Sequence, residues 1–360
     1  MSSAAQPIPT VLAAGERRGL TVAERNFWLG AALTLLLVLV FQGVFYVERE
    51  ILHRSGEQRL VGNSSEAAMR YFTIPHIVIG FLFSVSAQRN RTPRRRALIG
   101  GLLLLGAALC YVYYRLDGYR DPAVAILVYS YFLVHEMRDE SFFYTLLGGG
   151  PPIADRARFA RLSYGLMAVV LGGLAVLVWP AIAYGLVPRA QALSLMSAPA
   201  ALRETAALAP FAIWVTGSYL FLQRFAAVEG EGRIDLLLRR HAPLFRLFCG
   251  VVLMLGVAMV IAQRPYAIIL LHVSVWYVFT CRMLAARPPS QPPADWWGWM
   301  RTTVAGFRVL HVGMALALIG LGVFWMYAIG GGTWLRYFLS AESFLYWTIM
   351  HITVSFVPRP

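Results

Sequence analysis

The sequence predicts an all-α protein, a polytopic bundle of about ten transmembrane helices with both termini in the cytoplasm. Hydrophobic residues make up 58% of the 360 residues and charged residues only 14%, whereas a soluble domain is about 25% charged. Apolar runs near the ~20 residues that cross a bilayer core alternate with short polar links. These observations favour a protein that lies in a lipid bilayer, with almost no water-soluble domain.

Ten apolar runs account for most of the chain. They lie at 27–47, 71–88, 97–114, 122–146, 164–187, 205–223, 244–262, 265–283, 305–329 and 337–357. The first run is too long for the apolar core of a signal peptide, so we expect it to be a retained helix. The sequence therefore predicts a cytoplasmic N-terminal tail at 1–26 and a single transmembrane helical domain at 27–360.

The distribution of arginine predicts the orientation of these helices. All 32 basic residues are arginine, and almost all lie in the links or termini. Links on one side of a ten-span chain, with the termini, carry 20 arginines, and links on the opposite side carry 10. Because cytoplasmic loops are enriched in basic residues, this bias predicts cytoplasmic termini, as in a bacterial inner-membrane protein. The net charge of +14 is explained by these links, so we expect no nucleic-acid partner.

Histidines lie inside the predicted spans. Five of the seven fall on five different runs, and ionisable groups at such positions are costly and usually functional. These five are His76, His135, His272, His311 and His351. The pattern favours a shared metal or haem site over hydrogen bonds between helices or a proton path. With a rise of ~1.5 Å per residue, the histidines form either two tiers at different depths or one site near the midplane.

The fourth run also contains a cluster of ionisable residues. His135 and Asp139 are separated by one helical turn and share a face, as do Glu136 and Glu140. Arg138 can neutralise Asp139 or Glu140. Imidazole and carboxylate together form the ligand set expected for non-haem iron. The alternative is that this part of the helix faces a water-filled vestibule.

The order of these motifs resembles the Brp/Blh family of bacterial β-carotene 15,15′-dioxygenases. The similar positions are Pro75-His76, His135-Glu136 with Asp139, His272, and His351 near the chain end. Ile77 stands where the family has glycine after the first histidine, and Met350 stands where it has proline. The resemblance implies non-haem iron held by histidines and oxygen-dependent cleavage of a carotenoid.

We therefore expect a membrane-embedded iron oxidoreductase, of oxygenase type, that acts on a lipid-soluble substrate. The candidate metal ligands are His76, His135, His272 and His351. Additional ligands, or residues that orient the ligands, are Glu136, Arg138, Asp139, Glu140 and His311. The alternatives are a haem-binding electron-transfer protein, a transporter or proton-coupled carrier, and a structural subunit that binds pigment or partner helices. The expected partners are the lipid bilayer and a hydrophobic substrate or a redox partner.

Overall fold

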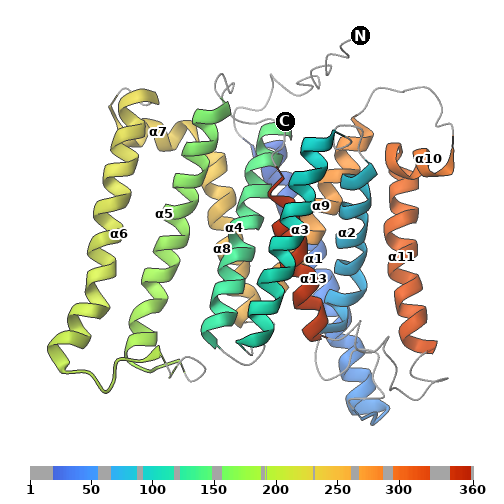
Figure 1. Cartoon of the computed structure of the whole chain (residues 1–360), viewed down its shortest axis with the longest axis horizontal. Helices are drawn as coiled ribbons and strands as arrows, with labels where there is room; N and C mark the ends of the chain where they lie inside the picture. Colours follow the sequence, from blue (N-terminus) through green and yellow to red (C-terminus); the bar gives the residue numbers. More distant parts are fainter. Residues whose placement is uncertain are drawn as a thin grey trace. The chain divides into compact units, whose positions relative to one another are not determined.

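The residues described by the computed structural model form helices joined by short turns, with no strand among them (Figure 1). The described residues are 19–55, 66–86, 92–116, 122–147, 156–187, 191, 193–229, 232–260, 267–286, 295–324 and 341–357. The helices are α1 (Val22–Tyr46), the π-helical turn η1 (Val47–Ile51), α2 (Glu66–Ser86), α3 (Pro93–Arg115), α4 (Pro122–Leu147), α5 (Arg156–Ala183), α6 (Ala200–Glu229), α7 (Ile234–Arg240), α8 (Ala242–Val260), α9 (Ala267–Ala285), α10 (Trp296–Thr302), α11 (Val304–Phe324) and α13 (Ala341–Ser355). This confirms the predicted all-α class.

Six of these helices are long and apolar enough to cross a membrane. They lie at Val22–Ile51, Pro93–Arg115, Ala157–Ala183, Ala200–Val228, Ala267–Ala285 and Val304–Phe324. Helices α7 and α8 are also long and apolar enough when they are taken together as one span, although the chain bends by 78° between them. The protein is thus an integral membrane protein of the helical type. Each of the ten predicted runs overlaps one long helix, but the count of ten spans stays a prediction.

The first helix begins before the first apolar run. The Thr21 hydroxyl accepts a hydrogen bond from the Glu24 backbone N–H at 3.2 Å, and the Glu24 carboxylate accepts one from the Thr21 N–H at 2.8 Å. This reciprocal capping box satisfies backbone donors that a helix start leaves open. The helix therefore begins at Val22, within the predicted tail at 1–26, whose first 18 residues lie outside the described part of the chain.

The chain forms two compact units. Unit 1 comprises Met1–Phe27 and Leu133–Leu253, and unit 2 comprises Trp28–Phe132 and Met254–Pro360. The expectation of a single domain at 27–360 stays a prediction.

Unit 2 is organised around α2, which contacts α9, α11 and α13. Buried clusters join Phe41, Tyr71 and Leu270 on one side, and Ile79, Leu284 and Phe307 on another. Helix α13 packs against α3 along its length (Figure 1). These contacts fix the relative positions of α2, α9 and α13.

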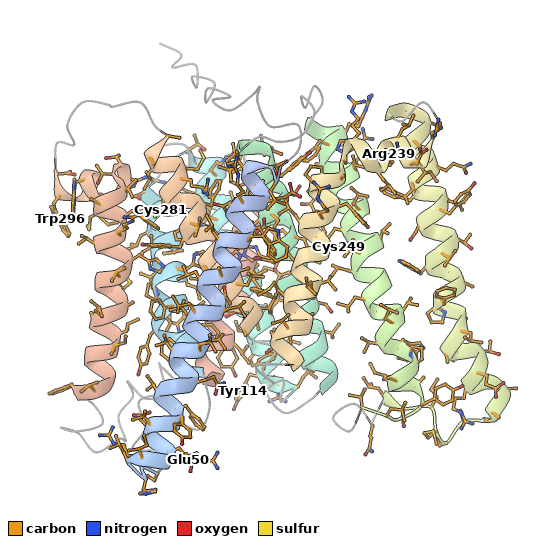
Figure 2. The ribbon with its side chains drawn as sticks, turned by 180° about the vertical axis from the view of Figure 1, so that it is seen from behind. Glu50, Tyr114, Arg239, Cys249, Cys281 and Trp296 are labelled. Carbon is orange, nitrogen blue, oxygen red and sulfur yellow. The ribbon has the colours of Figure 1, made fainter. Side chains whose placement is uncertain are left out.

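Unit 1 contains the hairpin of α5 and α6, the short α7 and most of α8. The Trp214 indole N–H on α6 donates a hydrogen bond of 2.9 Å to the Val169 carbonyl on α5, and Trp179 on α5 donates one of 2.7 Å to Ala206 on α6. Arg239 is exposed on α7, as Figure 2 shows. Helices α5 and α6 carry exposed apolar side chains, among them Leu177, Leu208 and Ile213.

Candidate metal centre

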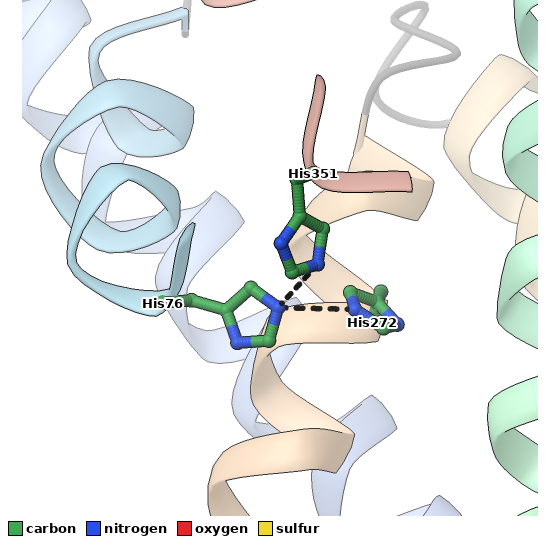
Figure 3. A group of neighbouring side chains, drawn as sticks. All are labelled: His76, His272 and His351. Atoms are coloured by element: carbon green, nitrogen blue, oxygen red, sulfur yellow. Dashed lines mark hydrogen bonds between the residues drawn. The ribbon is translucent and has the colours of Figure 1, made fainter. Parts of the chain in front are cut away.

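Three histidines of unit 2 point toward one another from three helices. His76 lies on α2, His272 on α9 and His351 on α13 (Figure 3). His76 follows Pro75, which lacks a backbone N–H and removes one hydrogen bond from the α2 ladder. His76 and His272 are each only 2% exposed. We call these three residues the histidine triad.

The Nε2 atoms of the triad converge. The Nε2 atom of His76 lies 3.1 Å from the Nε2 atom of His351 and 3.1 Å from that of His272. The possible ligand atoms of all three residues lie within 4.8 Å of one another. A single imidazole nitrogen carries either one hydrogen or one lone pair, so His76 Nε2 makes a good hydrogen bond with only one of its two neighbours. A cation between the rings would satisfy all three nitrogens together.

The spacing of these atoms fits metal coordination. Metal–imidazole bonds are about 2.0–2.1 Å long. Two nitrogens 3.1 Å apart at that bond length subtend about 95–102° at the metal. This range lies between the roughly 90° of octahedral and the roughly 109° of tetrahedral geometry, and three protein ligands leave at least one position open in either geometry. Open positions are what distinguish a catalytic from a purely structural metal site.

Helix α13 is held so that His351 reaches the other two rings. Gly106 on α3 allows a close approach, because a Cβ there would lie 3.5 Å from the Met350 Cα atom and 2.8 Å from its sulfur. The Tyr131 hydroxyl, in the first part of α4, donates a hydrogen bond of 3.1 Å to the Thr353 hydroxyl. The position of His351 thus depends on small and polar residues that the apolar pattern does not single out.

Aromatic rings surround the triad. The Trp276 ring lies 4.4 Å from the His76 ring, edge to face, and the Phe132 ring lies 5.9 Å from the His272 ring. Apolar walls exclude water and so strengthen electrostatic interactions at the site. Trp276 was not among the candidate residues. Its position one turn after His272, on the same helical face, is the sequence signal that could have found it.

His311 lies on α11 in the same unit but outside the triad. It is 3% exposed, and its ring packs against Tyr277, Phe307 and Trp276 at centroid distances of 5.1, 6.0 and 6.3 Å. It therefore belongs to the surroundings of the site, not to the set of three converging nitrogens.

The ionisable cluster of the fourth run lies in the part of α4 that belongs to unit 1. His135, Glu136, Asp139 and Glu140 are all buried there, with exposures of 1 to 4%. The His135 Nδ1 atom is 4.0 Å from an oxygen of Asp139, as the spacing of one turn predicts. Neither carboxylate oxygen of Glu140 has a hydrogen-bond partner in the described part of the chain. Glu140 therefore accepts no hydrogen bond from Arg138 in that part of the chain, and the predicted pairing of Arg138 with Asp139 or Glu140 stays a prediction.

The structure bears on the choice between two tiers and one site that the sequence leaves open. Counted from the ends of the apolar runs, His351 belongs to a different tier from His76 and His272, whereas the structure brings all three into one group. A shift of one turn in the boundary of a run moves a side chain by about 5 Å along the axis. For these three histidines the single-site arrangement is the one observed.

Comparisons with known proteins add no relative. No family model matches the chain, and no curated protein or solved structure matches it.

Proposed function

We propose that the chain is a membrane-embedded non-haem iron oxidoreductase that acts on a lipid-soluble substrate. The observation that carries this proposal is the convergence of the His76, His272 and His351 Nε2 atoms inside an apolar bundle. Imidazole nitrogens bind iron, zinc, copper and nickel. The separation of 3.1 Å fits octahedral and tetrahedral coordination about equally well, and iron is proposed first because the resemblance to the Brp/Blh family implies it.

In this proposal the three imidazoles hold the metal, which supplies the redox chemistry. Trp276 and Phe132 exclude water from the rings of His76 and His272. The substrate reaches the site from the bilayer. The resemblance to the Brp/Blh family makes a carotenoid or another conjugated lipid-soluble molecule the substrate class to test first.

Haem is less well supported by the same distances. Two histidines that ligate one haem lie on opposite faces of the porphyrin, which places their nitrogens about 4 Å apart at the usual bond lengths. The two pairs that include His76, with nitrogens 3.1 Å apart, leave no space for a porphyrin between them.

A carrier is the second candidate, and the ionisable cluster of α4 is the observation that favours it. Buried carboxylates within a membrane helix mark proton or ion paths in many transporters. Glu136, Asp139 and Glu140 are such a group. Under this alternative the triad would bind a transported cation and would not be redox-active.

Elemental analysis together with an absorption spectrum separates these candidates. Protein purified in mild detergent from iron-replete cells should contain about one iron per chain and no porphyrin band. A porphyrin band would select the haem alternative. Folded protein that contains neither iron nor haem would contradict the oxidoreductase proposal and leave the carrier.

The proposal includes ten spans with both termini on the cytoplasmic side of an inner membrane, because of the arginine bias. Reporter fusions at residues 92 and 292 should report a cytoplasmic position, and a fusion at residue 118 a periplasmic one. The link at 89–96 carries five arginines, so a periplasmic result at residue 92 would overturn the orientation.

A further inference from the structure

The side chain of His311 lies outside the triad and has a buried nitrogen that the proposed metal centre does not explain. Its Nε2 atom is buried, and no hydrogen-bond partner lies within reach among the described residues. Arg308 precedes His311 on helix α11, and the residues that follow His311 on this helix are apolar, with Val312 exposed and Ala315 buried. Because a buried polar atom without a partner is costly, such an atom in a candidate functional region points to a group that binds there.

The walls around this nitrogen are aromatic. Trp276 and Tyr277 come from α9 and Phe307 from the preceding turn of α11, and all three rings contact the His311 ring. Sites for small molecules typically combine apolar and aromatic walls with a few polar groups that fix orientation. Three aromatic rings around one imidazole nitrogen have this composition.

Trp276 connects this region to the triad. Its ring contacts His76 at 4.4 Å and His311 at 6.3 Å, measured between ring centroids. Helix α11 is also close to the lipid, since Val312 and Leu316 are 42% and 62% exposed. In the proposal that follows, the ligand reaches His311 from the bilayer beside α11.

We propose that His311 binds the oxygen-bearing end of a lipid-soluble ring compound, through a hydrogen bond from or to its Nε2 atom. The imidazole nitrogen donates to a carbonyl oxygen or accepts from a hydroxyl group. The aromatic walls favour a flat or conjugated ring. The inference rests on the proposed function, because it describes the substrate of that site as an alcohol or ketone and not a pure hydrocarbon.

The test compares two probes that differ only in one oxygen, 2-naphthol and naphthalene. Binding of each radiolabelled probe is measured on the full chain in lipid nanodiscs, with partition into empty nanodiscs subtracted. The wild-type chain should prefer 2-naphthol by about tenfold, the effect of one buried hydrogen bond. His311→Phe should abolish this preference while it retains naphthalene binding, and His311→Gln, which keeps a polar group, should retain part of it.

A variant at Trp276 serves as the matched control. Trp276→Leu removes an aromatic wall and not the polar atom. Both probes should therefore bind more weakly, and the preference for 2-naphthol should be preserved. Equal binding of the two probes by the wild-type chain would overturn the inference, as would a preference that persists in His311→Phe.

Iron content measured on the same samples separates this inference from the proposed function. Iron at about one per chain without a preference for 2-naphthol contradicts the role of His311 alone. A preference for 2-naphthol that His311→Phe abolishes, in protein without iron, supports the binding site and contradicts the iron centre.

Discussion

The two groups of buried ionisable residues are built differently. In unit 2 the histidine triad takes one residue from each of three helices that are far apart in the sequence. In unit 1 the cluster of α4 takes all its residues from His135–Glu140, on a single helix. Three rings from three helices can surround one point, whereas side chains along one helix share a face and leave the opposite side open. The difference shows that ligands can converge on one point only when several helices pack around it.

The largest expected effect is the loss of metal from the triad. His272→Ala and His351→Ala should each remove most of the iron, because two remaining imidazoles do not complete one face of the coordination sphere. Elemental analysis of purified, monodisperse protein measures this loss.

The matched controls are His311→Phe, which changes a buried histidine of the same unit, and His53→Ala, which changes an exposed one. Both should keep their iron. Equal iron loss in His311→Phe and His351→Ala would show that burial, not ligation, determines the metal content.

A substitution at Arg138, in the cluster of α4, should lower the stability of the protein and leave its metal content unchanged. In the predicted pairing of Arg138 with Asp139 or Glu140, Arg138→Ala leaves a buried carboxylate without its counter-charge, and breaking a buried pair costs roughly 3–5 kcal/mol. We expect a sharply lower folded yield and melting temperature, with the iron content of the surviving protein unchanged. A wild-type melting temperature would indicate that water solvates the cluster.

A packing change far along the sequence should affect the triad. Gly106→Leu forces α3 away from Met350, the neighbour of His351, and overpacking of this kind costs typically 1–3 kcal/mol. Iron content should fall along with the melting temperature, because His351 moves with α13.

Gly101→Leu is the control, since nothing lies within 4 Å of a Cβ at that position on the same helix. It should leave both quantities unchanged. Full iron occupancy in destabilised Gly106→Leu protein would mean that the triad does not depend on this contact.

The smallest expected effect is that of Glu140→Gln. The Glu140 carboxyl oxygens accept no hydrogen bond in the described part of the chain, so a neutral amide of the same shape should change the unfolding free energy by less than about 1 kcal/mol in either direction. Thermal unfolding measures the change. A loss as large as that of Arg138→Ala would show that Glu140 is charged and paired in the membrane.

The sequence was most informative about the helices. Apolar runs near the length of a membrane crossing predicted the positions of α1, α3 and α11 to within several residues, because lipid requires a continuous apolar surface on a helix whose backbone is bonded internally. The exact starts were missed where polar side chains cap a helix, as Thr21 and Glu24 do before α1.

The candidate residues were predicted with less success. The free-energy cost of an ionisable group inside a membrane identified His76, His272 and His351 as candidates. The same criterion identified His311 and His135 equally. Trp276 was not predicted as a candidate residue, because one aromatic side chain in an apolar run does not differ from its neighbours in hydrophobicity.

The sequence by itself determined that the chain is helical, that it belongs in a bilayer, and which ionisable residues the bilayer makes costly. These properties depend on composition and on spacing along one helix, which are local. Only the tertiary structure decided that His76, His272 and His351 meet while His311 stands apart among aromatic rings. That decision depends on helix contacts such as Gly106 against Met350. The shift of one turn that separates a converging group from a dispersed one is comparable to the error of a boundary read from hydrophobicity, about two to four residues.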